Sequence, residues 1–306
     1  MICAYCGEER KGTREHIISK GILDLFPECN LTYDNTKGIV HNAELFIKDV
    51  CVECNNKRLS YIDAYAKQFV SKYFLKDYEE NAVLDIEYDY AKMQKIFLKY
   101  AYNDIRMRKD NANFFDADII NYLLCEENII PKDNVQIFAG LAVNVTPIPR
   151  AWRGNQKIEW TSTPKFLKNS IIRFIDDKTG TVYLSDKFET IDFPELEVAY
   201  VFRFNSLQII LLCWNKNKDN INIEGTLFER IYPYTLLSKD GKSEISICTD
   251  ENNYFNLPMV HVRWDLSNQS GTMRRLASGG SYSYKELYEK EWKKEEEKIA
   301  QSRPRK

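Results

Sequence analysis

Two pairs of cysteines near the N-terminus constrain the fold of this chain more than any other sequence feature. Cys3 and Cys6 form the first CxxC pair, and Cys51 and Cys54 form the second. Each CxxC turn can offer two thiolates, so two such pairs suit one tetrahedral Zn²⁺ ion. A segment this short buries little apolar area, and a structural zinc ion would supply folding energy that packing cannot. The pattern predicts a zinc-bound module over residues 1–65.

The composition indicates a globular protein. The chain has 306 residues, 44% of them hydrophobic, which is enough for one large domain or two modest ones. The four remaining cysteines are scattered, which fits a reducing compartment better than a secreted disulfide framework. No apolar run has the length of a membrane span, and the N-terminus shows no signal peptide. We therefore expect a cytoplasmic protein without a membrane partner.

The pattern of the remaining chain predicts an α+β protein. Residues 66–132 are mainly helical, with one helix over 88–108, and residues 133–283 are rich in strands. That helix carries a basic stripe of Lys92, Lys95, Lys99 and Arg106, which could line a DNA channel or be an ordinary solvated face. The segments 196–204 and 207–214, joined by Asn205-Ser206, predict a hairpin with a buried second strand. Residues 284–306 predict a charged C-terminal helix and tail. These ranges, with the module at 1–65, are the predicted domains.

Glu15 and His16 lie between the two cysteine pairs, and Asn55 directly follows the second pair. Hydrolysis of a phosphodiester needs a base that activates water and a divalent cation that neutralises developing charge. A carboxylate and an amide oxygen are hard ligands that suit Mg²⁺ or Mn²⁺, unlike the thiolates that suit zinc. The side chains of Glu15 and His16 would point to opposite faces of a strand unless a bend brings both to one site.

Taken together, Cys-x-x-Cys, Glu-His-Ile-Ile and Val-Cys-x-x-Cys-Asn-Asn-Lys resemble the HNH endonucleases of the ββα-metal superfamily. The resemblance covers about the first 65 residues. It implies an N-terminal ββα-metal module in which His16 is the general base and Glu15 and Asn55 hold the catalytic Mg²⁺ or Mn²⁺. It also implies that Cys3, Cys6, Cys51 and Cys54 hold a structural Zn²⁺.

Several further residues are candidates around this motif. The family has a middle asparagine that orients the base, and the candidates here are Asn30, Asn35 and Asn42. His41 lies in the same segment and could support the site, although a loop histidine is more often solvated. Ser19 replaces the proline usual in this branch of the family. Arg14, Lys57 and Arg58 are candidate phosphate contacts, with ordinary surface charge as the alternative.

The resemblance implies a metal-dependent endonuclease that hydrolyses DNA, with RNA as the other nucleic acid to consider. Such modules occur in bacterial defence and mobile-element systems, which we take only as an analogy. The formal net charge of the chain is −2, so any contact with nucleic acid must come from local clusters. The β-rich region would serve substrate selection, regulation or assembly, through a homo-oligomer or a regulatory partner. The alternative is a zinc ribbon that binds nucleic acid or protein without catalysis.

Overall fold

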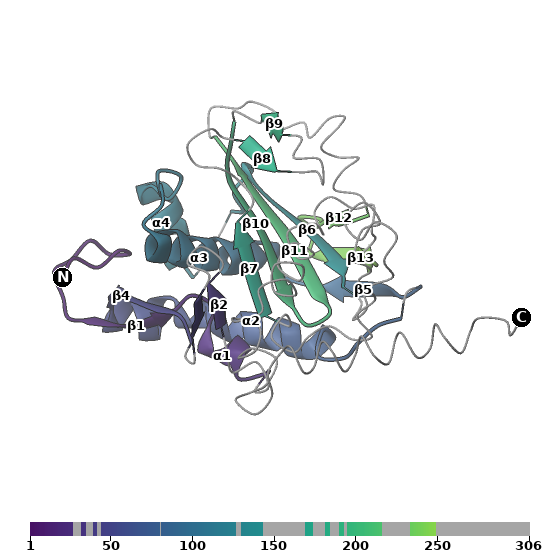
Figure 1. The fold of residues 1–306 in the computed structure, drawn as a ribbon, viewed down its shortest axis with the longest axis horizontal. Coiled ribbons are helices and arrows are strands. Elements are labelled where there is room, and N and C mark those ends of the chain that lie inside the picture. Colours follow the sequence, from purple (N-terminus) through teal and green to yellow (C-terminus); the bar gives the residue numbers. More distant parts are fainter. Residues whose placement is uncertain are drawn as a thin grey trace, which may run out of the picture.

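The computed structural model describes most of the first half of the chain and the strands of the second half. The described residues are 1–26, 32–34, 39–41, 44–79, 81–126, 130–142, 169–173, 181–183, 190–192, 195–215 and 233–248. Helices and sheets are both present, which confirms the α+β class. The possible metal ligands of the two CxxC pairs lie together near the N-terminus. Figure 1 shows the arrangement of the elements.

The N-terminal part contains two antiparallel strands followed by a helix. Strand β1 (Gly12–His16) pairs with β4 (Phe46–Cys51), and the register shifts between Thr13 and Glu15. Gly12 is required at the start of β1, because a Cβ there would lie 2.2 Å from the Lys48 carbonyl oxygen. After β4 come a π-helical turn, η1 (Cys54–Arg58), and helix α2 (Ser60–Tyr73).

Short elements fill the segment between β1 and β4. Helix α1 (Lys20–Leu23) follows β1 directly. Strands β2 (Thr32–Asp34) and β3 (Ile39–His41) then form an antiparallel pair. Residues 28–43 are polar and rich in turn-forming residues, and this short pair of strands lies within them.

Helix α3 (Tyr90–Arg108) is central to the molecule. Its first turn is capped by Asp89, whose side chain accepts a hydrogen bond of 3.0 Å from the Lys92 backbone. Figure 1 shows α3 behind the largest sheet, with α2 and the N-terminal strands beneath it. Helix α4 (Ala117–Leu124), capped by Asp116, follows.

The largest sheet has five strands in the order β12-β6-β11-β10-β7, and all its pairs are antiparallel. Its strands are β6 (Val135–Leu141), β7 (Asn169–Arg173), β10 (Leu196–Phe204), β11 (Leu207–Trp214) and β12 (Thr235–Leu236). The bounds of β10 and β11 confirm the predicted hairpin, whose turn holds Asn205 at a φ of 50°. Every residue of β11 is buried.

Two smaller pairs of strands complete the described structure. Strand β5 (Val83–Glu87) pairs with β13 (Lys242–Ser246), and β8 (Thr181–Tyr183) pairs with β9 (Thr190–Asp192). Residues 66–132 are therefore not entirely helical, because β5 lies among them. The predicted charged helix 284–306 lies outside the described residues.

One connected hydrophobic core extends from Cys3 to Ile245 and includes residues of α2, α3 and the large sheet. Phe97 and Tyr100 of α3 pack against Phe202 and Phe204 of β10, with ring centroids 5.0 to 6.5 Å apart. The division of the chain at residue 65 stays a prediction, and the core is continuous across it. Among the described helices, none has the length and apolar character needed to cross a membrane.

The basic stripe expected along α3 is not a solvated surface at Lys95 and Lys99. Both Lys95 and Lys99 have an exposed fraction of 0%. Lys99 forms ion pairs with two carboxylates, whereas Lys95 donates to the Tyr61 hydroxyl and to the Cys125 carbonyl and lies over the Tyr122 ring. Helical spacing places residues on one face, but it does not say whether that face meets water or other polar groups.

Candidate functional site

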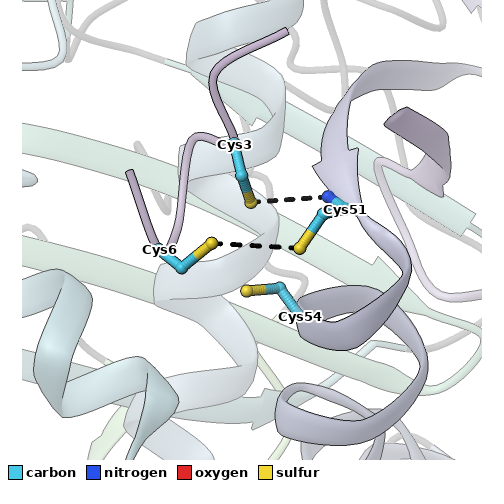
Figure 2. A group of neighbouring side chains, drawn as sticks. All are labelled: Cys3, Cys6, Cys51 and Cys54. Carbon is cyan, nitrogen blue, oxygen red and sulfur yellow. Dashed lines mark hydrogen bonds between the residues drawn. The ribbon is translucent and has the colours of Figure 1, made fainter. Parts of the chain in front are cut away.

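The four cysteines of the CxxC pairs converge on one point, as Figure 2 shows. Their sulfur atoms all lie within 4.8 Å of one another, and the Sγ atoms of Cys6 and Cys51 are 3.9 Å apart. A tetrahedral zinc site with Zn–S bonds of ~2.3 Å has sulfur–sulfur edges of ~3.8 Å. Cys3, Cys51 and Cys54 are buried and Cys6 is partly exposed. The donor set and its spacing therefore suit one structural zinc ion.

The local backbone explains how four cysteines reach one point. Gly7 takes a φ of 70°, which lets the chain turn immediately after Cys6, and the Gly7 amide donates to the Cys3 carbonyl at 2.9 Å. Cys51 ends β4, and Cys54 begins η1. In that turn the Leu59 amide donates to the Cys54 carbonyl, five residues back, at 2.9 Å. The wide turn places the second cysteine pair at the junction of β4 and the helix.

The thiols of this cluster differ in acidity. Burial opposes ionisation of Cys3, but hydrogen bonds from the Cys51, Cys6 and Tyr5 backbone more than offset it and lower the pKa of Cys3 to about 6. Burial raises the pKa of the Cys54 thiol well above its ordinary range. A thiolate is the form that binds zinc, and bound zinc favours ionisation of its thiol ligands. Cys3 is thus more readily ionised than Cys54 before zinc binds.

Asn55 is attached to β1 by its side-chain amide. The Asn55 Nδ2 donates to the Thr13 hydroxyl at 3.0 Å and to the Arg14 carbonyl at 2.9 Å. These two bonds use the nitrogen and leave the amide oxygen as the atom that can bind a cation. The start of the helical segment is therefore fixed directly beside the strand that carries Glu15 and His16.

Glu15 is buried, with an exposed fraction of 3%. Its Oε1 lies 2.8 Å from the Lys99 Nζ and accepts a hydrogen bond of 3.2 Å from the Asn103 Nδ2. The Lys99 Nζ also lies 2.7 and 2.6 Å from the two carboxylate oxygens of Asp63 in α2. Burial raises the pKa of the Asp63 carboxyl, and the charge of Lys99 opposes that rise. Glu15 thus belongs to a charge cluster of Glu15, Asp63 and Lys99, in which Glu15 and Lys99 are buried and Asp63 is partly exposed.

His16, the neighbouring residue, has a different environment. Its side chain is 24% exposed, and its Nε2 lies 2.9 Å from the Glu44 Oε2. Glu44 also forms a 2.6 Å ion pair with Lys20 of α1. A carboxylate on one ring nitrogen holds the imidazole and leaves the other nitrogen, Nδ1, to exchange a proton with a reactant. The different exposures of Glu15 and His16 agree with the expectation that adjacent strand residues point to opposite faces.

The other predicted residues are only partly described. Arg14 places its guanidinium 4.9 Å from the Phe46 ring centroid, and Lys57 forms an exposed ion pair with Glu53 at 2.9 Å. Arg58 ends the η1 turn. His41 lies at the end of β3, and its side chain is outside the described part of the structure. The candidates for the middle asparagine, Asn30, Asn35 and Asn42, also lie outside it.

Three residues near the motif were not found from the sequence. These are Glu44 beside His16, and Lys99 and Asn103 beside Glu15. Glu44 lies close to His16 because His16 pairs with Phe46 at the beginning of β4. This strand register could not be read from the sequence. Lys99 and Asn103 share one face of α3, but no local pattern indicates that this face meets Glu15, more than 80 residues earlier.

The resemblance led us to expect a divalent cation at Glu15. Within the described residues, the four cysteines are the only group of three or more His, Cys, Asp or Glu side chains that converge. A second cation would therefore rest on Glu15 and the amide oxygen of Asn55. The contacts that Glu15 makes with α3 both use Oε1 and leave Oε2 for a ligand bond.

Comparison with known protein families, with curated proteins and with solved structures gave no match for this chain.

Proposed function

We propose that the chain is a metal-dependent endonuclease of the HNH type that hydrolyses phosphodiester bonds of DNA. The observation that carries this proposal is the attachment of Asn55 to β1 beside the Glu15-His16 pair. It places Asn55 next to the strand that carries Glu15 and His16, while the clustered cysteines join the N-terminal turn to the junction of β4 and η1. The succession of β1, β4 and a helix is also the order that a ββα-metal module needs.

In this proposal each residue has a distinct role. His16 accepts a proton from the attacking water, and Glu44 holds its ring in place through Nε2. Glu15 and Asn55 hold the Mg²⁺ or Mn²⁺ ion, which supplies charge stabilisation for the phosphate and the leaving oxygen. The four cysteines hold Zn²⁺ as a structural ion. Arg14, Lys57 and Arg58 are the candidate contacts for the phosphate backbone.

The test is nicking of supercoiled plasmid by the zinc-loaded full chain. We expect cleavage with Mg²⁺ or Mn²⁺ and none with excess chelator that leaves the zinc in place. His16→Ala should lower the cleavage rate by about 10²–10⁴-fold, because it removes the base. Zinc content and the thermal unfolding temperature of His16→Ala should match the wild type. Cleavage at the wild-type rate by His16→Ala would refute the assignment of the base. A labelled RNA in parallel reactions distinguishes the two nucleic acids.

A second candidate function is a zinc module that binds nucleic acid or protein without cleaving it. The ion pair between Glu15 and Lys99 favours this alternative, because the carboxylate already has a positive partner. DNA binding with no cleavage under any divalent cation would support it. In that case His16→Ala and Glu15→Gln should leave the affinity for DNA unchanged.

A further inference from the structure

Two polar side chains of helix α3, Lys99 and Asn103, contact the Glu15-His16 pair. We propose that Lys99 and Asn103 are positioning residues, which hold Glu15 and His16 in the arrangement that the catalytic cation and the water require. This inference rests on the proposed function. It means that the active site depends on a helix that begins 25 residues after the segment that resembles the nuclease family.

Lys99 fixes the side chain of Glu15 at one oxygen. The ammonium group is completely buried, 2.8 Å from the Glu15 Oε1, and is shared with both oxygens of Asp63. A buried carboxylate needs such partners, because removing it from water is costly. Since Lys99 is divided between two carboxylates, it balances only one of the two negative charges. The remaining charge is available to attract a divalent cation to Glu15.

Asn103 connects the side chain of Glu15 to the backbone of His16. Its Nδ2 donates to the Glu15 Oε1 at 3.2 Å and to the His16 carbonyl at 3.0 Å. Its Oδ1 accepts from the Tyr5 hydroxyl at 2.9 Å and from the Arg106 Nη2 at 2.6 Å. Because the amide nitrogen donates and the amide oxygen accepts, these contacts fix the orientation of the Asn103 side chain. Asn103 thereby links the first cysteine turn, which contains Tyr5, to the strand with the proposed catalytic residues.

The same helix offers a matched control. Lys95 lies one turn before Lys99 and is equally buried, with an exposed fraction of 0% for both. The Lys95 ammonium contacts the Tyr61 hydroxyl and the Cys125 carbonyl, and no contact joins it to Glu15, His16 or Asn55. A substitution at Lys95 therefore removes a buried lysine from α3 without touching the proposed site.

The experiment compares Lys99→Arg, Lys99→Met, Asn103→Ala and Lys95→Met in the full zinc-loaded chain. Mn²⁺ binding is followed by electron paramagnetic resonance, and plasmid cleavage gives kcat and KM. Partners of ligand side chains typically change metal affinity or activity by about 10–100-fold. We expect Lys99→Arg and Asn103→Ala to weaken Mn²⁺ binding by at least about 10-fold and to lower kcat with little change in KM. Lys95→Met should retain both values.

Lys99→Arg keeps the positive charge, so it remains informative if Lys99→Met fails to fold. Zinc content and unfolding temperature show which variants are folded. If the wild type cleaves DNA and the folded Lys99 and Asn103 variants behave like Lys95→Met, the positioning role is overturned while the nuclease proposal stands. If the wild type neither binds Mn²⁺ nor cleaves, both are overturned. Mn²⁺ binding that depends on Lys99 without any cleavage supports the positioning of Glu15 and rejects hydrolysis.

Discussion

Strand β1 of the N-terminal module and strand β11 of the five-stranded sheet are stabilised by different interactions. Strand β1 contains no buried apolar residue, and its single buried side chain is the carboxylate of Glu15. Strand β11 is buried at every position, and most of its side chains are aliphatic. Strand β1 is therefore held by polar contacts of Glu15, whereas β11 is held by apolar packing. Other parts of the module, including Val50 and Ile62, belong to the shared hydrophobic core. Both kinds of structure meet at α3, whose Tyr100 contacts Ser19 on one side and the β10 aromatic rings on the other.

Removal of zinc is expected to produce the largest difference between the two regions. Apparent binding free energies for structural zinc are about 10–16 kcal/mol, so Cys51→Ser should unfold the strand pair β1 and β4. Hydrogen exchange measured by mass spectrometry should show lost protection in residues 12–16 and 46–58. Strands β10 and β11 should remain protected. Cys125→Ser, at an exposed cysteine outside the cluster, is the control. Simultaneous loss of protection in β10 and β11 would mean that the two regions unfold as one unit.

Leu211→Ala should destabilise the five-stranded sheet and leave the zinc site unchanged. Leu211 is completely buried in β11 and belongs to the hydrophobic core, so truncation should lower the free energy of unfolding by about 2–5 kcal/mol. Zinc content should not change, since Leu211 has no role at the cysteine cluster. Urea denaturation followed by tryptophan fluorescence measures the loss. The exposed Lys239, paired with Asp133 at the surface, gives the comparison Lys239→Ala, for which we expect less than about 0.5 kcal/mol.

Lys95→Met should show a smaller effect that depends on pH. Burial lowers the pKa of Lys95 from 10.5 to about 8. Between these two values the unfolded chain binds more protons at this position, so wild-type stability should rise with pH relative to Lys95→Met. The difference should change by roughly 1–3 kcal/mol between pH 7.5 and 10, because one pKa unit corresponds to ~1.4 kcal/mol. Urea denaturation of both proteins across this range measures it. A constant difference would show that Lys95 has the same pKa in the folded and the unfolded chain.

These contrasts also explain what could be predicted from the sequence. The strands β10 and β11 were predicted with correct bounds, because an apolar run interrupted by Asn205-Ser206 is a local signal. The cysteine cluster was predicted because the CxxC spacing is itself local. The pairing of β5 with β13 joins residues about 160 positions apart, and no local pattern indicates it.

The surroundings of the motif were less predictable for the same reason. Lys99 was assigned to a basic surface stripe, since periodicity reveals a face but not its partner. The acids opposite that face, the buried Glu15 and the partly exposed Asp63, come from two other elements. Glu44 was missed because its position beside His16 depends on how β1 and β4 are aligned. The chemistry of the motif could be inferred from residue types, but its environment required the three-dimensional arrangement.

The π-helical turn η1 sets the rotational phase between the second cysteine pair and the rest of α2. One residue turns a helix by ~100°, so the additional residue in this turn decides which side of α2 faces the core. With the present phase, Cys54 reaches the zinc cluster, Asn55 reaches β1 and Asp63 reaches Lys99. Deletion of Leu59 would preserve the zinc ligands but rotate Asp63 away from Lys99. The length of this turn therefore acts as a spacer that keeps the zinc site and the charge cluster in alignment.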